Sequence, residues 1–400
     1  MTGRIHCAAS LKKSLSDFDT KDRVKTLRSL SSPSDGDNQS RLHELDGWRA
    51  LSVLLVVQQH AVTHQHDRIL SLHPYLAFVE RYVGVLGVKI FFVISGFVIC
   101  RLLLLEERKY GAASLKGFYL RRIFRIIPPF AFYLGTVSLL LYFGLIIEPW
   151  KAILGAALFM SDIHVWPWGR FVGHIWSLAV EEQFYLTFPP IFVFAPRRWR
   201  NYLVFGCLAT FVLWSLSMTF TGWDSLVSGD VRTGFVCICC GVLMALHRDR
   251  VHRLVSRVPA FVVVLIGITL VLHPVVSDSL QGALYESLLV PPSIGILLVF
   301  TLERQSWLRS VLCSRPAQAI GITSYGIYLW QQLFTVPAWT FPAASHTIPM
   351  LLPLLVIIVP LSYFLVEKPS MRYGKALSRR AIESSTSAKA VASILQAEHE

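Results

Sequence analysis

Charged side chains are scarce in this sequence. Of its 400 residues, 16% are charged and 54% are hydrophobic, and the mean hydropathy is +0.52. This composition excludes an ordinary soluble globular protein, which carries about a quarter charged residues. It also excludes a disordered chain, which is poor in apolar residues. We therefore expect an all-α polytopic membrane protein.

Features of several other protein classes are missing as well. The seven cysteines fall in apolar stretches or on segments expected to face the cytoplasm, so we expect no disulfide framework. Cys237, Cys239 and Cys240 point in different directions on one apolar helix, which favours small packing residues over a metal site. Residues 1–40 are polar and lack the apolar core that is typical of a signal sequence.

Apolar runs bounded by charge predict ten spans, because about 20 helical residues are needed to cross the hydrocarbon core. The apolar piece at 152–160 is too brief to cross, and we expect one short re-entrant or interfacial segment there. The predicted transmembrane helices lie near 46–64, 82–104, 128–147, 175–195, 202–221, 231–247, 259–276, 282–302, 318–338 and 347–366.

The basic residues predict the orientation of these spans. With a cytoplasmic amino terminus, 31 of the 38 Lys and Arg residues fall on inner segments, as the positive-inside rule requires. Both termini are then cytoplasmic (N-in/C-in). The formal net charge of +13 is explained by this topology and by contact with anionic membrane lipids, so we expect no nucleic-acid partner.

The spans divide the chain into three parts. We expect a flexible cytoplasmic tail at 1–41, a membrane domain at 42–369 and a cytoplasmic C-terminal tail at 370–400. The Ala/Ser-rich end of the last part is either a short helix or disordered. We expect no second globular domain after the spans.

Polar residues inside the first span indicate a functional site. Arg49 and His60 each oppose partition into lipid, so we expect them to face a polar interior. Eleven residues return His60 to nearly the same helix face as Arg49, about 16 Å farther along the axis. A neutral imidazole can take the proton of a hydroxyl near neutral pH, which makes His60 the candidate general base. The alternative is an outer cluster of His60, His64 and His66 without catalytic duty; as a metal site this cluster lacks a carboxylate motif to complete it.

A polar stripe on the fourth span supplies a partner for that base. Glu181 belongs to the stripe, whereas Glu182 is turned about 100° away. The depth of Glu181 differs from that of His60 by about 3 Å, so we expect its carboxylate to orient the ring or to stabilise the imidazolium. The alternative is a buried ion pair of these carboxylates with Lys89. The stripe consists of His174, Ser177, Glu181 and Tyr185.

Basic residues also gather at the inner end of the third span. Arg122 and Arg125 are three residues apart and share a helix face, so they are suited to grip the phosphates of a coenzyme A donor. Arg49 joins them or pairs with Asp46. The alternative interpretation of Arg122 and Arg125 is topology alone.

Six motifs, in this order, resemble the acyltransferase-3 family of integral-membrane O-acyltransferases. They extend from residue 45 to residue 369. The motifs are LDGWRALSVLLVVQQH at 45–60, GVKIFFVISGFVI at 87–99, FYLRRIFRIIPP at 118–129, HIWSLAVEEQFYL at 174–186, SYGIYLWQQ at 324–332 and FLVEKP at 364–369.

The resemblance implies a ten-helix core that moves an acyl group, commonly acetyl from cytoplasmic acyl-CoA, to a hydroxyl of a carbohydrate across the membrane. It implies functional roles for Arg49 and His60 and for the pair Arg122 and Arg125. It also implies a bacterial inner (cytoplasmic) membrane protein. The W-S-L-x-x-E-x-x-x-Y motif of the family falls on Trp176, Ser177, Leu178, Glu181 and Tyr185.

The second span and two departures from the family pattern complete the expectations. Gly96 favours close helix packing, and Ser95 is a candidate for contact with the acyl chain or donor. No Gly-x-Ser-x-Gly elbow surrounds Ser95, so a covalent acyl-serine is not supported. The family often has Asp at the position of Lys89, and we expect this lysine to pair with an acidic residue of the bundle. The family often has His where this chain has Gln331, so a mechanism that requires a second histidine at this position is disfavoured.

Together these residues and the resemblance predict a membrane O-acyltransferase. The resemblance implies acetyl-CoA as the donor substrate and a lipid-linked or surface polysaccharide as the acceptor, and we expect no permanently bound cofactor or metal. Two alternatives remain. A proton-coupled transporter also needs intramembrane His, Glu and Arg, although paired internal repeats are not evident. A non-catalytic membrane partner would keep the spans and tolerate the loss of His60.

Overall fold

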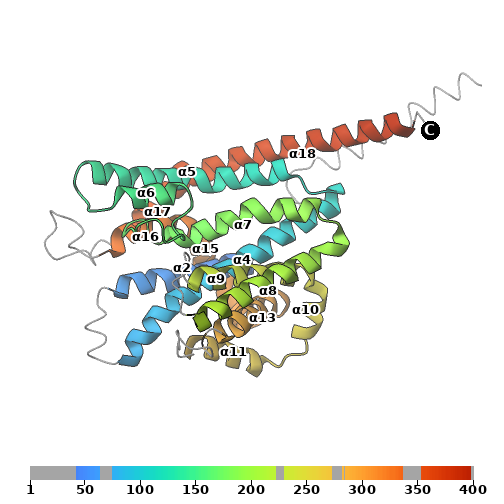
Figure 1. Ribbon diagram of the computed structural model, residues 1–400. Coiled ribbons are helices and arrows are strands. Elements are labelled where there is room, and N and C mark those ends of the chain that lie inside the picture. The colour runs from blue at the N-terminus through green and yellow to red at the C-terminus, as the bar shows by residue number, and fades with distance from the viewer. Residues whose placement is uncertain are drawn as a thin grey trace, which may run out of the picture. The chain divides into compact units, whose positions relative to one another are not determined.

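The computed structural model describes residues 42–63, 74–221, 229–272, 282, 284–336 and 353–397, which belong, from Glu44 on, to one compact unit. Every regular element in these ranges is a helix (Figure 1), so the predicted all-helical class is confirmed. The elements are α2 (His43–Thr63), α4 (Pro74–Tyr110), α5 (Leu115–Tyr142), α6 (Trp150–Ala157), α7 (Ile175–Phe194), α8 (Arg197–Thr221), α9 (Gly229–Leu246), α10 (Arg248–Val255), α11 (Ala260–Leu272), η1 (Tyr285–Leu289), α13 (Val290–Glu303), α14 (Trp307–Leu312), α15 (Arg315–Ile322), α16 (Ser324–Thr335), α17 (Leu355–Ser362), η4 (Tyr363–Glu367) and α18 (Lys368–Ala397).

Three described helices are long and apolar enough to cross a membrane. They are Tyr82–Tyr110 within α4, the whole of α5, and Tyr285–Glu303, which joins η1 to α13. A fourth candidate is the pair Asp230–Leu246 and Arg248–Val255, bent by 91°. These helices fit a membrane protein, while the ten spans and their orientation stay a prediction. α6 has only 8 residues and is too short to cross.

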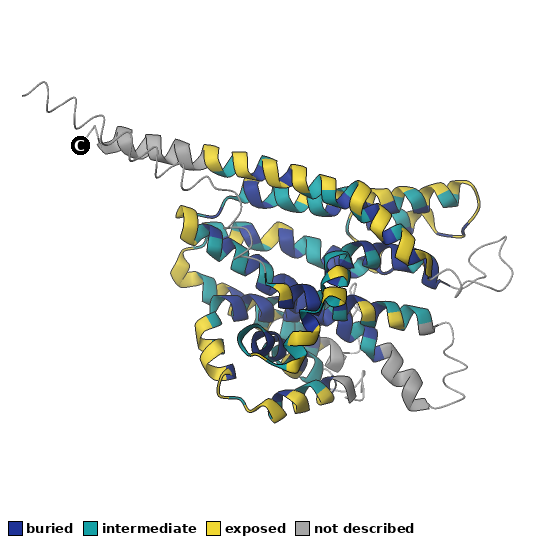
Figure 2. Cartoon of the chain, turned by 180° about the vertical axis from the view of Figure 1, so that it is seen from behind, coloured by how far each residue is buried: buried dark blue, intermediate teal, exposed yellow. Residues whose placement is uncertain are grey.

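The helices α4 and α9 pack against each other at glycines. A Cβ atom at Gly96 of α4 would collide with the carbonyl oxygen of Ile238, and one at Gly241 of α9 would collide with that of Val93. Only glycine lets the two backbones come so close. The close packing predicted at Gly96 is confirmed. Figure 2 shows the buried residues concentrated where the helices meet one another.

The chain after the last predicted span forms the long helix α18, which lies along α5 (Figure 1). Tyr373 packs edge-on against Phe124, with ring centroids 5.1 Å apart. Arg121 of α5 donates a hydrogen bond to the Ser378 hydroxyl at 2.6 Å and forms an ion pair with Glu106 of α4 at 2.7 Å. The segment that the sequence assigned to a tail is thus helical and, through Ser378, tied to two other helices.

One carboxylate holds the segment that precedes α7. Glu148 accepts hydrogen bonds from the backbone N–H groups of Arg170, Phe171 and Val172 at 2.9, 3.2 and 3.3 Å. Burial raises the pKa of Glu148, and the three backbone donors act in the opposite direction. The Tyr133 hydroxyl donates to the Phe171 carbonyl at 2.6 Å. These bonds fix where α7 begins and therefore the depth of its polar stripe.

Lys89 is buried, with 3% of its surface exposed, and forms an ion pair with Glu286 of η1. Its ammonium group also lies 5.8 Å from the centre of the Tyr82 ring. The predicted pairing of Lys89 with an acidic residue of the bundle is confirmed. The partner is Glu286, so the alternative in which Lys89 neutralises Glu181 and Glu182 is wrong.

Candidate active site

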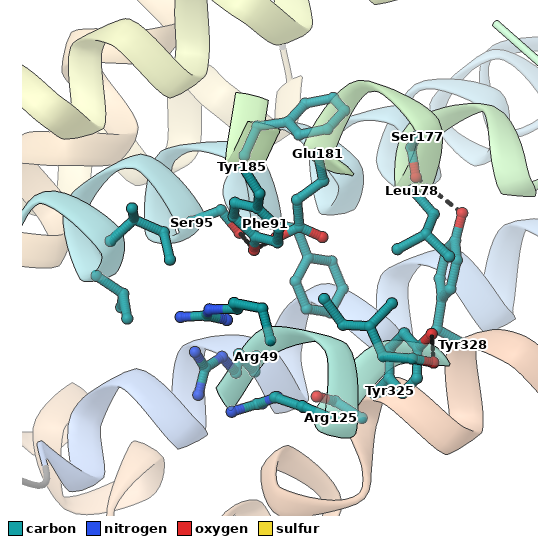
Figure 3. Close-up of a pocket in the computed structure, with 16 residues that line it drawn as sticks. Arg49, Phe91, Ser95, Arg125, Ser177, Leu178, Glu181, Tyr185, Tyr325 and Tyr328 are labelled. Atoms are coloured by element: carbon teal, nitrogen blue, oxygen red, sulfur yellow. Dashed lines mark hydrogen bonds between the residues drawn. The ribbon is translucent and has the colours of Figure 1, made fainter. Parts of the chain in front are cut away.

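A cavity of about 80 Å³ lies among α2, α4, α5, α7 and α16 (Figure 3). Its lining includes most of the residues that the sequence singled out: Arg49, Ser95, Arg122, Arg125, Ser177, Glu181 and Tyr185. Charged and hydroxyl-bearing side chains from five helices therefore converge within the bundle. A concave site with a few convergent polar groups is the ordinary form of a small-molecule site.

Three arginines gather at one end of the cavity. Arg49 comes from α2, and Arg122 and Arg125 come from α5. Arg49 also forms an ion pair with Asp46 at 3.3 Å. It therefore both joins the arginine cluster and pairs with Asp46, the two possibilities that the sequence left open. The guanidinium of Arg122 lies 5.0 Å from the centre of the Tyr185 ring, which orients it by a cation–π contact.

This cluster carries an excess of positive charge. Arg49 and Arg125 repel each other electrostatically, and both are attracted by Glu181. Glu367 also interacts with Arg125. Because guanidinium groups stay charged in proteins and present several N–H donors each, such a cluster is suited to bind phosphate or carboxylate groups.

Glu181 stands at the centre of the cavity, held by two hydroxyl groups. Its Oε1 atom accepts hydrogen bonds from the Ser95 hydroxyl of α4 and from the Tyr185 hydroxyl one helical turn away. Glu182, its neighbour in sequence, does not belong to the cavity lining among the described residues. The predicted division between the two carboxylates is thus seen in the structure, and Ser95 is tied to Glu181.

At the other end of the cavity, α7 and α16 are joined by a hydroxyl chain. The Tyr328 hydroxyl donates to the backbone carbonyl of His174, and the Ser177 hydroxyl lies 2.8 Å from the Tyr328 hydroxyl. Because the Tyr328 proton is used on the carbonyl, Ser177 is the donor to Tyr328. Figure 3 shows Ser177 and Tyr328 facing each other beside Leu178.

The candidate base is placed differently from the other predicted residues. His60 is half-buried on α2, and among the residues that the structure describes it is not part of the cavity lining. It interacts electrostatically with His174 at the start of α7. The approach of His60 to Glu181 stays a prediction, since the hydrogen bonds of Glu181 go to Ser95 and Tyr185. His64 and His66 lie outside the described residues.

Three residues that the sequence analysis did not select lie in or near the site. Tyr325 and Tyr328 line the cavity. Glu367 is buried, with 3% of its surface exposed, and its Oε1 atom lies against Gly326. The motifs at 324–332 and 364–369 contain both features. Trp176 packs edge-on against Phe92, whose ring lines the cavity, with centroids 6.1 Å apart.

Comparison with known proteins identifies the protein family to which this chain is similar. The family model described as an acyltransferase domain matches residues 42–367. Peptidoglycan O-acetyltransferase OatA of Listeria monocytogenes is 27% identical over 368 residues, which is 82% of this chain and 56% of that protein. O-acetyltransferase OatA of Staphylococcus aureus is 27% identical over 391 residues, which is 89% of this chain and 60% of that protein. No solved structure gave a match.

The chain therefore spans less than two thirds of the length of these relatives. The match to the family model nevertheless covers the cavity lining, from Arg49 on α2 to Tyr328 on α16. On this evidence the chain belongs to the acyltransferase-3 family, as its six motifs indicated.

Proposed function

We propose that this protein is a membrane O-acetyltransferase that moves an acetyl group from acetyl-CoA to a hydroxyl of a surface polysaccharide. One observation carries the proposal: a single cavity joins three arginines to a carboxylate held by two hydroxyl groups. The names of the two relatives support acetyl transfer to a hydroxyl, and that of the Listeria protein supports peptidoglycan as the kind of acceptor.

The arginine end is the donor end in this proposal. Arg122 and Arg125 bind phosphates of coenzyme A, and the predicted topology puts them at the cytoplasmic side, where acetyl-CoA is available. Arg122 is oriented by the Tyr185 ring, and Arg125 interacts electrostatically with Glu367 and Glu181. Bidentate N–H contacts to phosphate oxygens are the strongest use of such side chains.

The chemical step joins the acceptor oxygen to the acetyl carbon and breaks the carbon–sulfur bond of the thioester. His60 takes the proton of the acceptor hydroxyl during attack, and coenzyme A leaves as a thiolate that gains a proton. The negative charge of Glu181 stabilises the imidazolium that forms on His60. The products are the acetyl ester and the free thiol, so atoms and charges balance.

Arg49 is the candidate group for stabilising the oxyanion that develops on the thioester carbonyl. The hydroxyl protons of Ser95, Tyr185, Ser177 and Tyr328 are all committed to other acceptors. The guanidinium of Arg49 lines the cavity. It donates one hydrogen bond to Asp46 and has further N–H donors. A preorganised donor of this kind lowers the barrier by about 3 kcal/mol.

The proposal is tested by mass spectrometry of surface polysaccharide from cells that lack the gene and carry either wild type, His60→Ala, Glu181→Gln or Glu182→Gln. Wild type should restore an acetyl mass increment, and the first two variants should fail at normal membrane levels. Glu182→Gln is the matched control, because this carboxylate lies outside the cavity lining, and it should restore the increment. A polysaccharide without added acetyl in the wild-type cells contradicts the proposed function. Restoration by His60→Ala contradicts only its base.

A further inference from the structure

The imidazole of His174 is buried and has no hydrogen-bond partner among the residues that the structure describes. His174 is 4% exposed and immediately precedes α7. Neither of its ring nitrogens makes a hydrogen bond to any residue that the structure describes. The Leu329 backbone interacts with the ring without reaching hydrogen-bond geometry. The His174 backbone, by contrast, is satisfied, since its carbonyl accepts from the Tyr328 hydroxyl.

A buried imidazole without a hydrogen-bond partner in the described part of the chain is a candidate for binding a ligand. A neutral imidazole has one N–H donor and one acceptor nitrogen, and buried groups of this kind are nearly always paired. A second orphan lies close by: Trp330 is 4% exposed, and its Nε1 atom has no partner in the described part of the chain. The Tyr133 ring contacts both side chains, with centroids 5.8 Å from His174 and 5.4 Å from Trp330.

The neighbours of His174 relate this position to the proposed chemistry. His174 interacts with His60, the proposed base, and its ring lies 5.1 Å from the Tyr328 ring. Tyr328 lines the cavity, and its hydroxyl contacts Ser177. His174 is therefore a neighbour both of the proposed base and of Tyr328, which lines the cavity.

We infer that His174 binds a hydroxyl group of the sugar acceptor and holds it beside His60. A sugar hydroxyl can donate to the unprotonated ring nitrogen or accept from the ring N–H, so a neutral imidazole can bind it through either nitrogen. The ring of Tyr328, which lines the cavity, offers an apolar face for the C–H side of a pyranose. This inference rests on the proposed function and names the acceptor end of the same site.

The test uses the full-length protein in lipid vesicles, with acetyl-CoA and soluble peptidoglycan fragments as substrates. His174→Phe keeps an aromatic ring and removes both nitrogens. It should raise the KM for the fragments about tenfold, the effect of one lost hydrogen bond in a buried site, and should leave the KM for acetyl-CoA unchanged. His174→Gln restores a donor and an acceptor and should recover part of the loss. His252→Phe, on α10 and paired with Glu303, is the matched control and should behave as wild type.

The following outcomes decide whether His174 binds the acceptor. An unchanged KM for the fragments in His174→Phe overturns the inference, because the imidazole then makes no contact with the acceptor. Equal rises in both KM values, with a lower thermal midpoint, also overturn it, because they indicate a packing role. If His174→Phe does not fold, Trp330→Phe removes the Nε1 donor along with part of the indole ring and should raise the KM for the fragments; no change in this variant overturns the subsite. Wild-type protein that transfers no acetyl group to the fragments counts against the proposed function itself.

Discussion

Ser95 on α4 donates a hydrogen bond to Glu181 on α7. This bond, together with that from Tyr185, fixes one carboxylate oxygen within a cavity whose other end holds three arginines. Ser95 is next to Gly96, where α4 presses against the α9 backbone. The Ser95 hydroxyl thus sits beside a close backbone contact between α4 and α9, which helps to fix its position.

Replacing Ser95 by alanine should lower the rate of acetyl transfer about tenfold, because Glu181 loses a donor worth about 1.5 kcal/mol. The thermal midpoint should change little, since Tyr185 still holds the carboxylate. The measurement is kcat with saturating acetyl-CoA, next to a thermal melt. Ser52→Ala is the matched control, because Ser52 is a fully buried serine outside the cavity lining. Equal rates for Ser95→Ala and wild type would show that the hydroxyl is dispensable.

Arg122→Ala and Arg125→Ala should each raise the KM for acetyl-CoA about tenfold, since each removes a charge-assisted contact to phosphate worth about 1.5 kcal/mol or more. The sharper readout compares acetyl-CoA with acetyl-pantetheine, which lacks the phosphates. Wild type should prefer acetyl-CoA, and the two variants should lose much of that preference.

Arg121→Ala is the control for these variants, because Arg121 is bound to Glu106 and Ser378. It should lower the thermal midpoint and keep the preference for acetyl-CoA. A preference that survives in Arg122→Ala and Arg125→Ala would assign these arginines to topology alone.

Helical spacing was sufficient to predict which polar residues share a face. Arg122 with Arg125, and Ser177 with Glu181 and Tyr185, line one cavity because residues three or four apart lie on the same side of a helix. Helical spacing does not predict which side chains of different helices contact each other. Nothing in the spacing indicates that Glu181 meets Ser95 or that Tyr328 binds the His174 carbonyl, since both depend on how the helices cross.

The C-terminal segment shows the same limit. An Ala/Ser-rich stretch has weak periodicity, so its helical state depends on a partner that the sequence does not name. That partner is α5, against which Tyr373 and Ser378 pack. Lys89 was easier to interpret, because a lone charge in an apolar span must find an opposite charge, although the choice of Glu286 required the fold.

Glu367→Gln should raise the KM for acetyl-CoA a few-fold while keeping kcat. Glu367 is buried, interacts with Arg125 and touches Gly326 of α16, so we expect it to orient the guanidinium. The substitution removes the interaction of Glu367 with Arg125, while Arg49 and Arg122 still repel this guanidinium and Glu181 and Asp46 still attract it, so the expected effect is small. The difference between the KM values for acetyl-CoA and acetyl-pantetheine should be smaller in Glu367→Gln than in wild type. An effect confined to the acceptor KM would contradict this role.

Lys89→Met should destabilise the protein by about 3 kcal/mol, because it leaves the Glu286 carboxylate in the bundle without its cation. The double variant Lys89→Met, Glu286→Leu removes both charges and should regain most of that loss, since a buried ion pair contributes little compared with apolar side chains of similar size. Thermal melts of the four proteins in one detergent form the double-mutant cycle. Additive losses in the double variant would mean that the two residues stabilise the bundle through separate contacts, such as that of Lys89 with the Tyr82 ring.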